Sequence, residues 1–244
     1  MKMPIVRGVI DRRILVNFRV DPVVLSWVIP RPFVPQIVNG LGIAGICLIR
    51  LRQIRPLGFP SMIGLSSENV AHRVAVEWEF ACERKTGVFV FRRDTSSGIN
   101  SLVGGRLFPG VHHLARFTSD EDNRRFQVDA KSIDSSVTVA VDGELSQEWT
   151  STSAFSTLDA ASHFFEKDCI GYSPQTMPGV FDGLELRTVG WQVEHLRMHC
   201  VKSSFFENTN LFPHGTIQLD CALLMRGIKH EWHKCDSLTD EDGP

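Results

Sequence analysis

The sequence lacks the features that define several large classes of protein. No apolar run among its 244 residues approaches the roughly 20 residues needed to span a bilayer. The opening MKMPIVRGVIDRR lacks the apolar centre and small-residue cleavage site of a signal peptide. No GxSxG elbow, phosphate-binding P-loop or GxGxxG motif after a strand is present. We therefore expect a cytoplasmic protein with no membrane partner, and serine hydrolase, nucleotide hydrolase and dinucleotide-binding functions have no support.

Closely spaced cysteine pairs are also missing. The six cysteines are spread singly, without a CxxC pair or a dense framework. Nitrogen and sulfur ligands for a metal ion occur in two local groups, His230, His233 and Cys235, and His195, His199 and Cys200. The first group borders an acidic tail that we expect to be disordered, and the histidines of the second would lie roughly 13 Å apart on a strand. We therefore expect reduced thiols, no metal site and no cofactor.

Neither sign of charge dominates the chain. A formal net charge of -2 and a pI near 6.5 provide no basic field that would attract nucleic acid or an anionic membrane. The composition, 43% hydrophobic and 22% charged, is that of a globular protein with a sizeable core. We expect one domain over residues 1–234, a disordered tail over 235–244, and a small molecule as the partner. The oligomeric state stays open, a homo-oligomer included.

Hydrophobic alternation predicts that the chain is mainly β-strand. Residues 9–20 have the pattern of a half-buried strand, after which Asp21 and Pro22 are typical of the cap and first residue of a helix. Residues 70–82 predict another strand, with a turn at 83–87 before the returning strand. Further segments predict strands or short helices: strands at 41–51, 116–130, 135–143 and beyond 184, and helices at 99–108 and 156–167.

These elements define a fold class. About eight or nine strands, three short helices and no βαβ rhythm favour an α+β protein of mainly antiparallel β structure. The expected architecture is an antiparallel barrel or folded sheet with the helices at its periphery.

The candidate ligand-binding residues gather between residues 68 and 115. Glu68 could act as a general acid or base if it were buried in a pocket. A guanidinium suits a carboxylate ligand because it offers two parallel donors to two oxygens. The adjacent His112 and His113 would point to opposite faces of an extended backbone, so at most one enters a pocket. We take Glu68 as the catalytic candidate, and the ligand-binding candidates are Arg19, Arg73, Arg106 and His112.

The order of several short motifs resembles a known family. NFRVDPVVLSWVIP, IRPLGFP, SENVAHRV, GVFVFRRD and SLVGGRLF follow one another as in the uncharacterised YqjF-like family of the acetoacetate decarboxylase-like superfamily. The resemblance covers about Val9 to Leu224. It implies a cone-like antiparallel barrel with peripheral helices and an active site in the cavity. It also implies that Glu68 lies near the superfamily's active-site glutamate, and Arg12 or Arg19 near an arginine of the first strand.

The same resemblance draws attention to a missing lysine. Decarboxylases of this superfamily form a Schiff base through one of two adjacent lysines in a Tyr-Pro-Lys-Lys-Leu-Gly run. Here the matching FPGVHHLA places either Gly110 and Val111 or His112 and His113 at those positions. We therefore expect a cavity that binds a small carboxylate or keto compound without imine chemistry, any reaction being acid–base rather than covalent. The alternative is a non-catalytic interaction module with a filled barrel.

Overall fold

The described residues form one large sheet. The computed structural model describes residues 4–98 and 110–242, and within them fourteen strands pair into a sheet that is mainly antiparallel. The parallel pairings join β6 (Glu83–Thr95) to β7 (His112–Glu121) and to β10 (Ile170–Pro174). The predicted fold class, α+β with mainly antiparallel β structure, is confirmed.

The remaining elements complete the sheet and its few helices. The other strands are β1 (Val6–Val20), β2 (Val34–Pro35), β3 (Ile37–Val38), β4 (Leu41–Pro56), β5 (Leu65–Phe80), β8 (Arg125–Ser132), β9 (Thr138–Leu145), β11 (Val180–Val189), β12 (Glu194–Ser203), β13 (Ile217–Lys234) and β14 (Leu238–Thr239). The helices are α1 (Pro22–Val28), α3 (Leu158–Lys167) and the short 3-10 turns η1 (Ser61–Ile63) and η2 (Asp240–Asp242).

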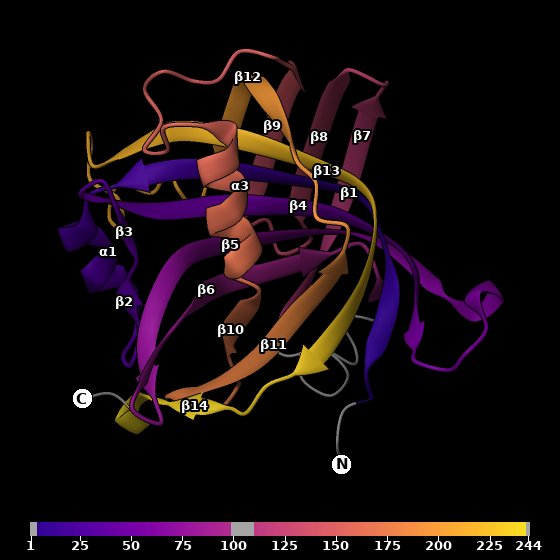
Figure 1. Cartoon of the computed structure of the whole chain (residues 1–244), viewed down its shortest axis with the longest axis horizontal. Helices are drawn as coiled ribbons and strands as arrows, with labels where there is room; N and C mark the ends of the chain where they lie inside the picture. The colour runs from indigo at the N-terminus through magenta and orange to yellow at the C-terminus, as the bar shows by residue number, and fades with distance from the viewer. Residues whose placement is uncertain (1–3, 99–109, 243–244) are drawn as a thin grey trace.

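The sheet closes on itself twice (Figure 1). Pairing of β5 with β6 closes a circuit that runs through β7, β8, β9, β12, β13, β1 and β4. Pairing of β11 with β13 closes a second circuit through β10, β6, β5, β4 and β1. The two circuits share β1, β4, β5, β6 and β13, which we call the shared wall. Because successive side chains of a strand point to opposite faces, alternate residues of this wall face two different interiors.

The first interior, enclosed with β7, β8 and β9, is filled by apolar side chains. Ile14, Leu48 and Val74 of the shared wall belong to one buried cluster with Val128 of β8 and Val141 of β9. Each such side chain contributes about 1.5–3 kcal/mol when it leaves water. These residues hold the wall against the smaller strands of the circuit.

The second interior lies on the other face of the wall, and α3 covers it (Figure 1). The side chain of Thr157 caps this helix by accepting a hydrogen bond from the amide of Ala160. Ala161 and Phe165 on its buried face pack in one cluster with Leu15 of β1. The helix predicted at 156–167 is thus confirmed, and its apolar stripe fixes it over the wall.

Several local predictions can be compared with the structure. The strand expected at 9–20 and the helix after it are confirmed, with the Asp21 side chain accepting a hydrogen bond from the amide of Val23. The turn predicted at 83–87 is wrong, because Ala81 and Cys82 make it with φ of 52° and 62°. Neither residue is typical of a two-residue hairpin turn, which usually contains Asn or Gly. The helix predicted at 99–108 lies outside the described residues.

The number of strands was underestimated. β2, β3 and β14 contain two residues each and leave no periodic pattern in the sequence. The single strand predicted over 116–130 is a hairpin of β7 and β8. In its turn, the Asp122 carboxylate accepts hydrogen bonds from the backbone amides of Arg124 and Arg125.

The acidic tail differs from the expectation of disorder. Residues 238 and 239 form β14, which pairs with β11 opposite Phe181 and Val180. Leu238 is only 1% exposed, and the Tyr172 hydroxyl donates a hydrogen bond of 3.1 Å to the carbonyl of Asp236. One buried leucine and one strand pairing therefore hold a segment whose composition is otherwise polar.

Replacing Leu238 tests this anchoring. Leu238→Ala should lower the free energy of unfolding by about 2–4 kcal/mol, because it leaves a cavity in the core. Urea denaturation monitored by tryptophan fluorescence measures the change, and Asp236→Ala on the exposed side of the same segment is the control. Equal stability of the two variants would mean that the tail does not pack.

Candidate functional site

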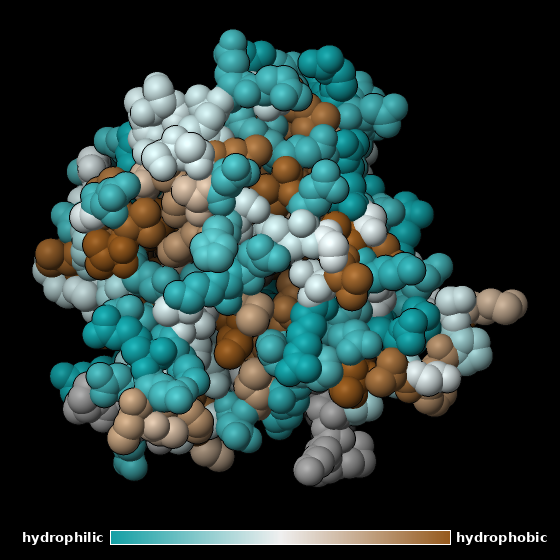
Figure 2. All heavy atoms as spheres, in the orientation of Figure 1, coloured by the Kyte–Doolittle hydropathy of each residue, from teal (hydrophilic) through white to brown (hydrophobic). Residues whose placement is uncertain are grey.

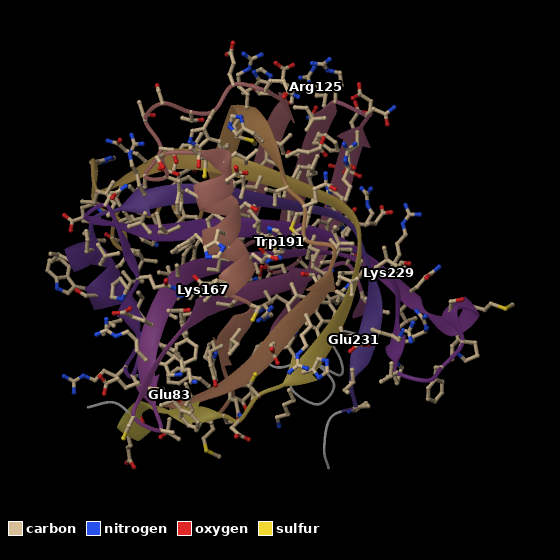
Figure 3. The ribbon with its side chains drawn as sticks, viewed as in Figure 1. Glu83, Arg125, Lys167, Trp191, Lys229 and Glu231 are labelled. Carbon is tan, nitrogen blue, oxygen red and sulfur yellow. The ribbon has the colours of Figure 1, made fainter. Side chains whose placement is uncertain are left out.

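A cavity of about 160 Å³ occupies the second interior, between the shared wall and α3. Trp191 lies beside α3 near the centre of the view in Figure 3 and forms part of the cavity lining. The apolar lining comes mainly from Leu51, Leu184, Leu186, Trp191 and Trp232. The charged and polar lining includes Arg13, Arg73, Arg93, His112 and Asp168. The cavity therefore has both an apolar and a strongly polar side.

Arg73 of β5 is the most buried cation of the cavity. Its side chain is 4% exposed, and its Nη2 donates a hydrogen bond of 2.6 Å to Asn17 Oδ1. The guanidinium carbon lies 4.9 Å from the centre of the Phe165 ring, a cation–π contact. Its Nε has no hydrogen-bond partner among the described residues. Desolvation lowers the pKa of Arg73 to about 10, which leaves the side chain charged at neutral pH.

Arg13 and Arg93 bring two more guanidinium groups to the same cavity. Arg93 Nε donates to the Ser173 hydroxyl at 3.1 Å, and Arg13 Nε donates to Cys47 Sγ at 3.3 Å. Desolvation lowers the pKa of Arg93 to about 10 as well. Among the residues of known placement, no carboxylate forms an ion pair with Arg13, Arg73 or Arg93. Within the described residues these three guanidinium groups thus have no ion-pair partner, while the carboxylates of Asp94, Glu166 and Asp168 belong to the same cavity lining.

Asp168, directly after α3, is a carboxylate in the same lining. It is 8% exposed, and its Oδ2 accepts a hydrogen bond of 2.7 Å from Gln36 Nε2. Within the described part of the chain, Oδ1 has no hydrogen-bond partner. Desolvation raises the pKa of Asp168, which moves this carboxyl group toward the range of a general acid or base. The sequence offered no signal for this role, because an aspartate that follows a helix is usually solvated.

Glu68 faces the first interior and belongs to a network of four charged side chains. Its Oε2 accepts from Arg12 Nη2 at 2.5 Å, and its Oε1 accepts from Arg50. Glu121 accepts from the same two arginines, at 2.6 Å from Arg12 and 2.8 Å from Arg50. Arg12 is only 2% exposed, so the two carboxylates balance a buried charge. Glu68 is not among the described residues that line the cavity.

The predicted site residues are therefore only partly brought together. Arg73 and His112 both line the cavity. Arg19 lies elsewhere: it donates a hydrogen bond of 2.8 Å to the Gln218 side chain, and it lies 3.8 Å from the Asp220 carboxylate. Arg106 lies outside the described residues. The roles assigned to Glu68, Arg19, Arg73, Arg106 and His112 stay predictions. Arg13, Arg93 and Asp168 were not selected from the sequence.

Metal and membrane features were sought in the described residues as well. Across residues 4–98 and 110–242, no group of three His, Cys, Asp or Glu side chains is placed to hold a metal ion. His195 is 6% exposed beside Trp149, while the side chain of His199 is 45% exposed. In the same ranges, no helix is long and apolar enough to cross a membrane.

Comparison with solved structures identifies the fold. An acetoacetate decarboxylase-like enzyme from Sphingomonas wittichii RW1 aligns over 98% of this chain and 93% of its own, with a TM-score of 0.60 and 11% identity. Acetoacetate decarboxylase from Legionella pneumophila aligns over 97% and 88%, with a TM-score of 0.59 and 11% identity. The enduracididine biosynthesis enzyme MppR, in complex with pyruvate, aligns over 99% and 92%, with a TM-score of 0.61 and 10% identity. The chain has the acetoacetate decarboxylase-like fold.

The family is narrower than the fold. The model of the DUF2071 family, described as an uncharacterized conserved protein, matches residues 10–217, and the chain belongs to this family. The resemblance inferred from the sequence motifs is thereby confirmed. No curated protein matches the sequence.

Replacing Glu68 separates a structural role from a role in the cavity. Glu68→Gln should lower the free energy of unfolding by about 1–3 kcal/mol, because Arg12 and Arg50 lose one of their two carboxylates. Affinity for any cavity ligand should stay constant, since the side chain faces the first interior. Chemical denaturation and ligand titration measure the two effects. Glu83→Gln, which alters an exposed pair with Lys85, is the matched control (Figure 3).

An opposite pair of results would support Glu68 as a catalytic or binding residue. These results are full stability of Glu68→Gln together with loss of ligand binding or turnover.

Proposed function

We propose that the cavity of the second interior binds a small carboxylate-bearing or 2-oxo compound. The observation that carries the proposal is Arg73, which is buried, charged and has an Nε without a partner among the described residues. A buried charge without a counter-ion is costly, so such groups in proteins are normally paired. A bound carboxylate would supply the missing partner through charge-assisted hydrogen bonds.

The shape of the cavity narrows the ligand class. Its volume of about 160 Å³ corresponds to roughly ten water-sized atoms. Three guanidinium groups on one side suit the carboxylate, and Trp191, Trp232 and the leucines suit a short apolar chain. These features favour a short-chain acid as the ligand. The complex of MppR with pyruvate gives a precedent in a protein of similar fold.

We propose further that the chain does not form a Schiff base. No lysine is present among the described residues that line the cavity. Lys131, Lys167, Lys202, Lys229 and Lys234 are exposed. Lys85 forms an ion pair with Glu83 beside the hairpin turn. Imine formation requires a primary amine that touches the carbonyl carbon, and these placements favour acid–base chemistry.

Asp168 is the carboxylate best placed for such acid–base chemistry. It lines the cavity together with Arg73, and burial raises its pKa. A proton acceptor beside a carboxylate-binding arginine can act on the carbon next to a carbonyl group. Glu68, the candidate chosen from the sequence, would have to act from the other face of the wall. The cytoplasmic location and a homo-oligomeric state remain predictions.

One observation favours the alternative hypothesis, in which the protein is a non-catalytic interaction module. The first interior is packed with apolar side chains, as a filled barrel would be. The face over α3, however, shows hydrophobic residues in small groups separated by hydrophilic ones (Figure 2). Large interaction sites are usually contiguous apolar patches.

A thermal-shift series tests binding. Pyruvate and related 2-oxo acids should raise the melting temperature of the protein, because a ligand that binds only the folded state stabilises it, whereas the corresponding neutral amides should not. Arg73→Met should weaken binding by about 10- to 100-fold, the value of hydrogen bonds to a charged group.

The same variant carries a second readout. Without ligand, Arg73→Met should melt at the same or a higher temperature, because it removes an uncompensated buried charge. Arg125→Met is the matched control, since Arg125 pairs with Asp142 at the surface, far from Trp191 in Figure 3. A flat response to every acid would favour the interaction module.

Reductive trapping tests the absence of imine chemistry. Incubation with pyruvate and borohydride should leave every lysine unmodified, because no primary amine reaches the cavity in the described structure. Intact mass and peptide mapping measure the result, with a Schiff-base decarboxylase as the positive control. A lysine carrying the reduced adduct would assign the chain to the imine-forming class.

A further inference from the structure

Cys47 is a thiol at the centre of the positive side of the cavity. It lies on β4 between Ile46 and Leu48, which belong to the first interior, so its own side chain faces the second. The residue is 8% exposed and lines the cavity. Its sulfur accepts the hydrogen bond from Arg13 Nε at 3.3 Å. The hydrogen bond fixes the sulfur beside the Arg13 guanidinium, inside the cavity lining.

The other two arginines lie within electrostatic reach of the same sulfur. Desolvation lowers the pKa of Arg73 and of Arg93, and in both cases the Cys47 sulfur exerts the largest opposing effect. Arg13 therefore touches the thiol, and Arg73 and Arg93 line the same cavity. Burial raises the pKa of Cys169, which lines the same cavity, and that of Cys235 to about 11, while burial and the neighbouring Asp220 raise the pKa of Cys221.

A second observation points to a ligand at this place. Arg73 Nε is buried without a described hydrogen-bond partner, and it belongs to the same lining as Cys47. A carboxylate bound by Arg73 would bring the adjacent carbonyl carbon of a 2-oxo acid toward the thiol. A neighbouring guanidinium could then stabilise the charge that develops on the carbonyl oxygen.

We propose that Cys47 is the nucleophile of the cavity and adds reversibly to the carbonyl carbon of a bound 2-oxo carboxylate. A bond forms between sulfur and carbon, the carbonyl π bond breaks, and the thiol proton is transferred to the former carbonyl oxygen. Nothing leaves, and nothing is oxidised or reduced. The inference rests on the proposed function and extends the acid–base chemistry expected from the sequence by a covalent step that needs no lysine.

Carbon-13 NMR of the intact protein with pyruvate labelled at C2 tests the addition. The wild type should convert part of the bound carbonyl signal into a signal of a tetrahedral carbon bonded to sulfur, at a chemical shift distinct from that of the hydrate of free pyruvate. Cys47→Ser and Cys47→Ala should abolish the tetrahedral signal while pyruvate still raises the melting temperature. Cys82→Ser, at the exposed hairpin turn, is the matched control and should behave as the wild type.

Alkylation provides an independent readout. Bromopyruvate should label Cys47 by forming a sulfur–carbon bond with release of bromide, at least about tenfold faster than neutral iodoacetamide, because the arginines attract the carboxylate. Arg73→Met should remove this preference, and peptide mapping identifies the labelled cysteine. Melting curves without ligand establish that each variant is folded.

The outcomes separate the inference from the proposed function. A thermal shift with pyruvate, but no tetrahedral carbon and no labelling of Cys47 ahead of Cys82, would overturn the nucleophile and retain the binding site. Absence of binding by any 2-oxo acid would overturn both.

Discussion

Burial of guanidinium charge without a carboxylate partner is the constraint on which the cavity depends. Arg73 is held by neutral groups alone, the Asn17 side-chain oxygen and the face of the Phe165 ring. Arg93 and Arg13 likewise donate to a hydroxyl and a thiol. Neutral partners satisfy individual N–H groups without cancelling the charge, so each of these guanidinium groups can still bind a carboxylate. The closed circuit of strands and α3 bury Arg73, while Arg13 and Arg93 are partly exposed.

The first interior shows the contrasting solution on the same strands. Arg12 and Arg50 are both paired there with Glu68 and Glu121, and Arg50 also lies 3.6 Å from Asp11. A balanced network of this kind specifies how strands meet, although its net contribution to stability is small. The balanced cluster therefore has the features of a structural device, whereas the unbalanced one has those of a binding site. This difference in charge balance, rather than the number of charged residues, distinguishes the two interiors.

The sequence predicted the fold better than the site, for physical reasons. The strand alternation of residues 9–20, the Asp21 cap and the stripe of α3 are local signals, and each of these was interpreted correctly. Arg73 was selected because a guanidinium suits a carboxylate, and His112 because one of two adjacent histidines can face a pocket. Arg93 could not be assigned to a face, because the register of β6 against β5 shifts between His72 and Arg73, and one extra residue reverses the direction of the side chains. Asp168 required knowledge of which elements surround α3.

Adjacent residues with nitrogen-bearing side chains on the shared wall are divided between the two interiors. On β1, Arg12 belongs to the ion-pair network of the first interior and Arg13 lines the cavity. On β5, His72 contacts the Ser203 hydroxyl on the side of the first interior, and Arg73 lines the cavity. One strand thus carries two separately variable sets of positions. Substitutions among the cavity-lining residues can change ligand specificity, while the residues that face the first interior maintain the fold. A chain built in this way can diversify its ligand within one family without rebuilding its architecture.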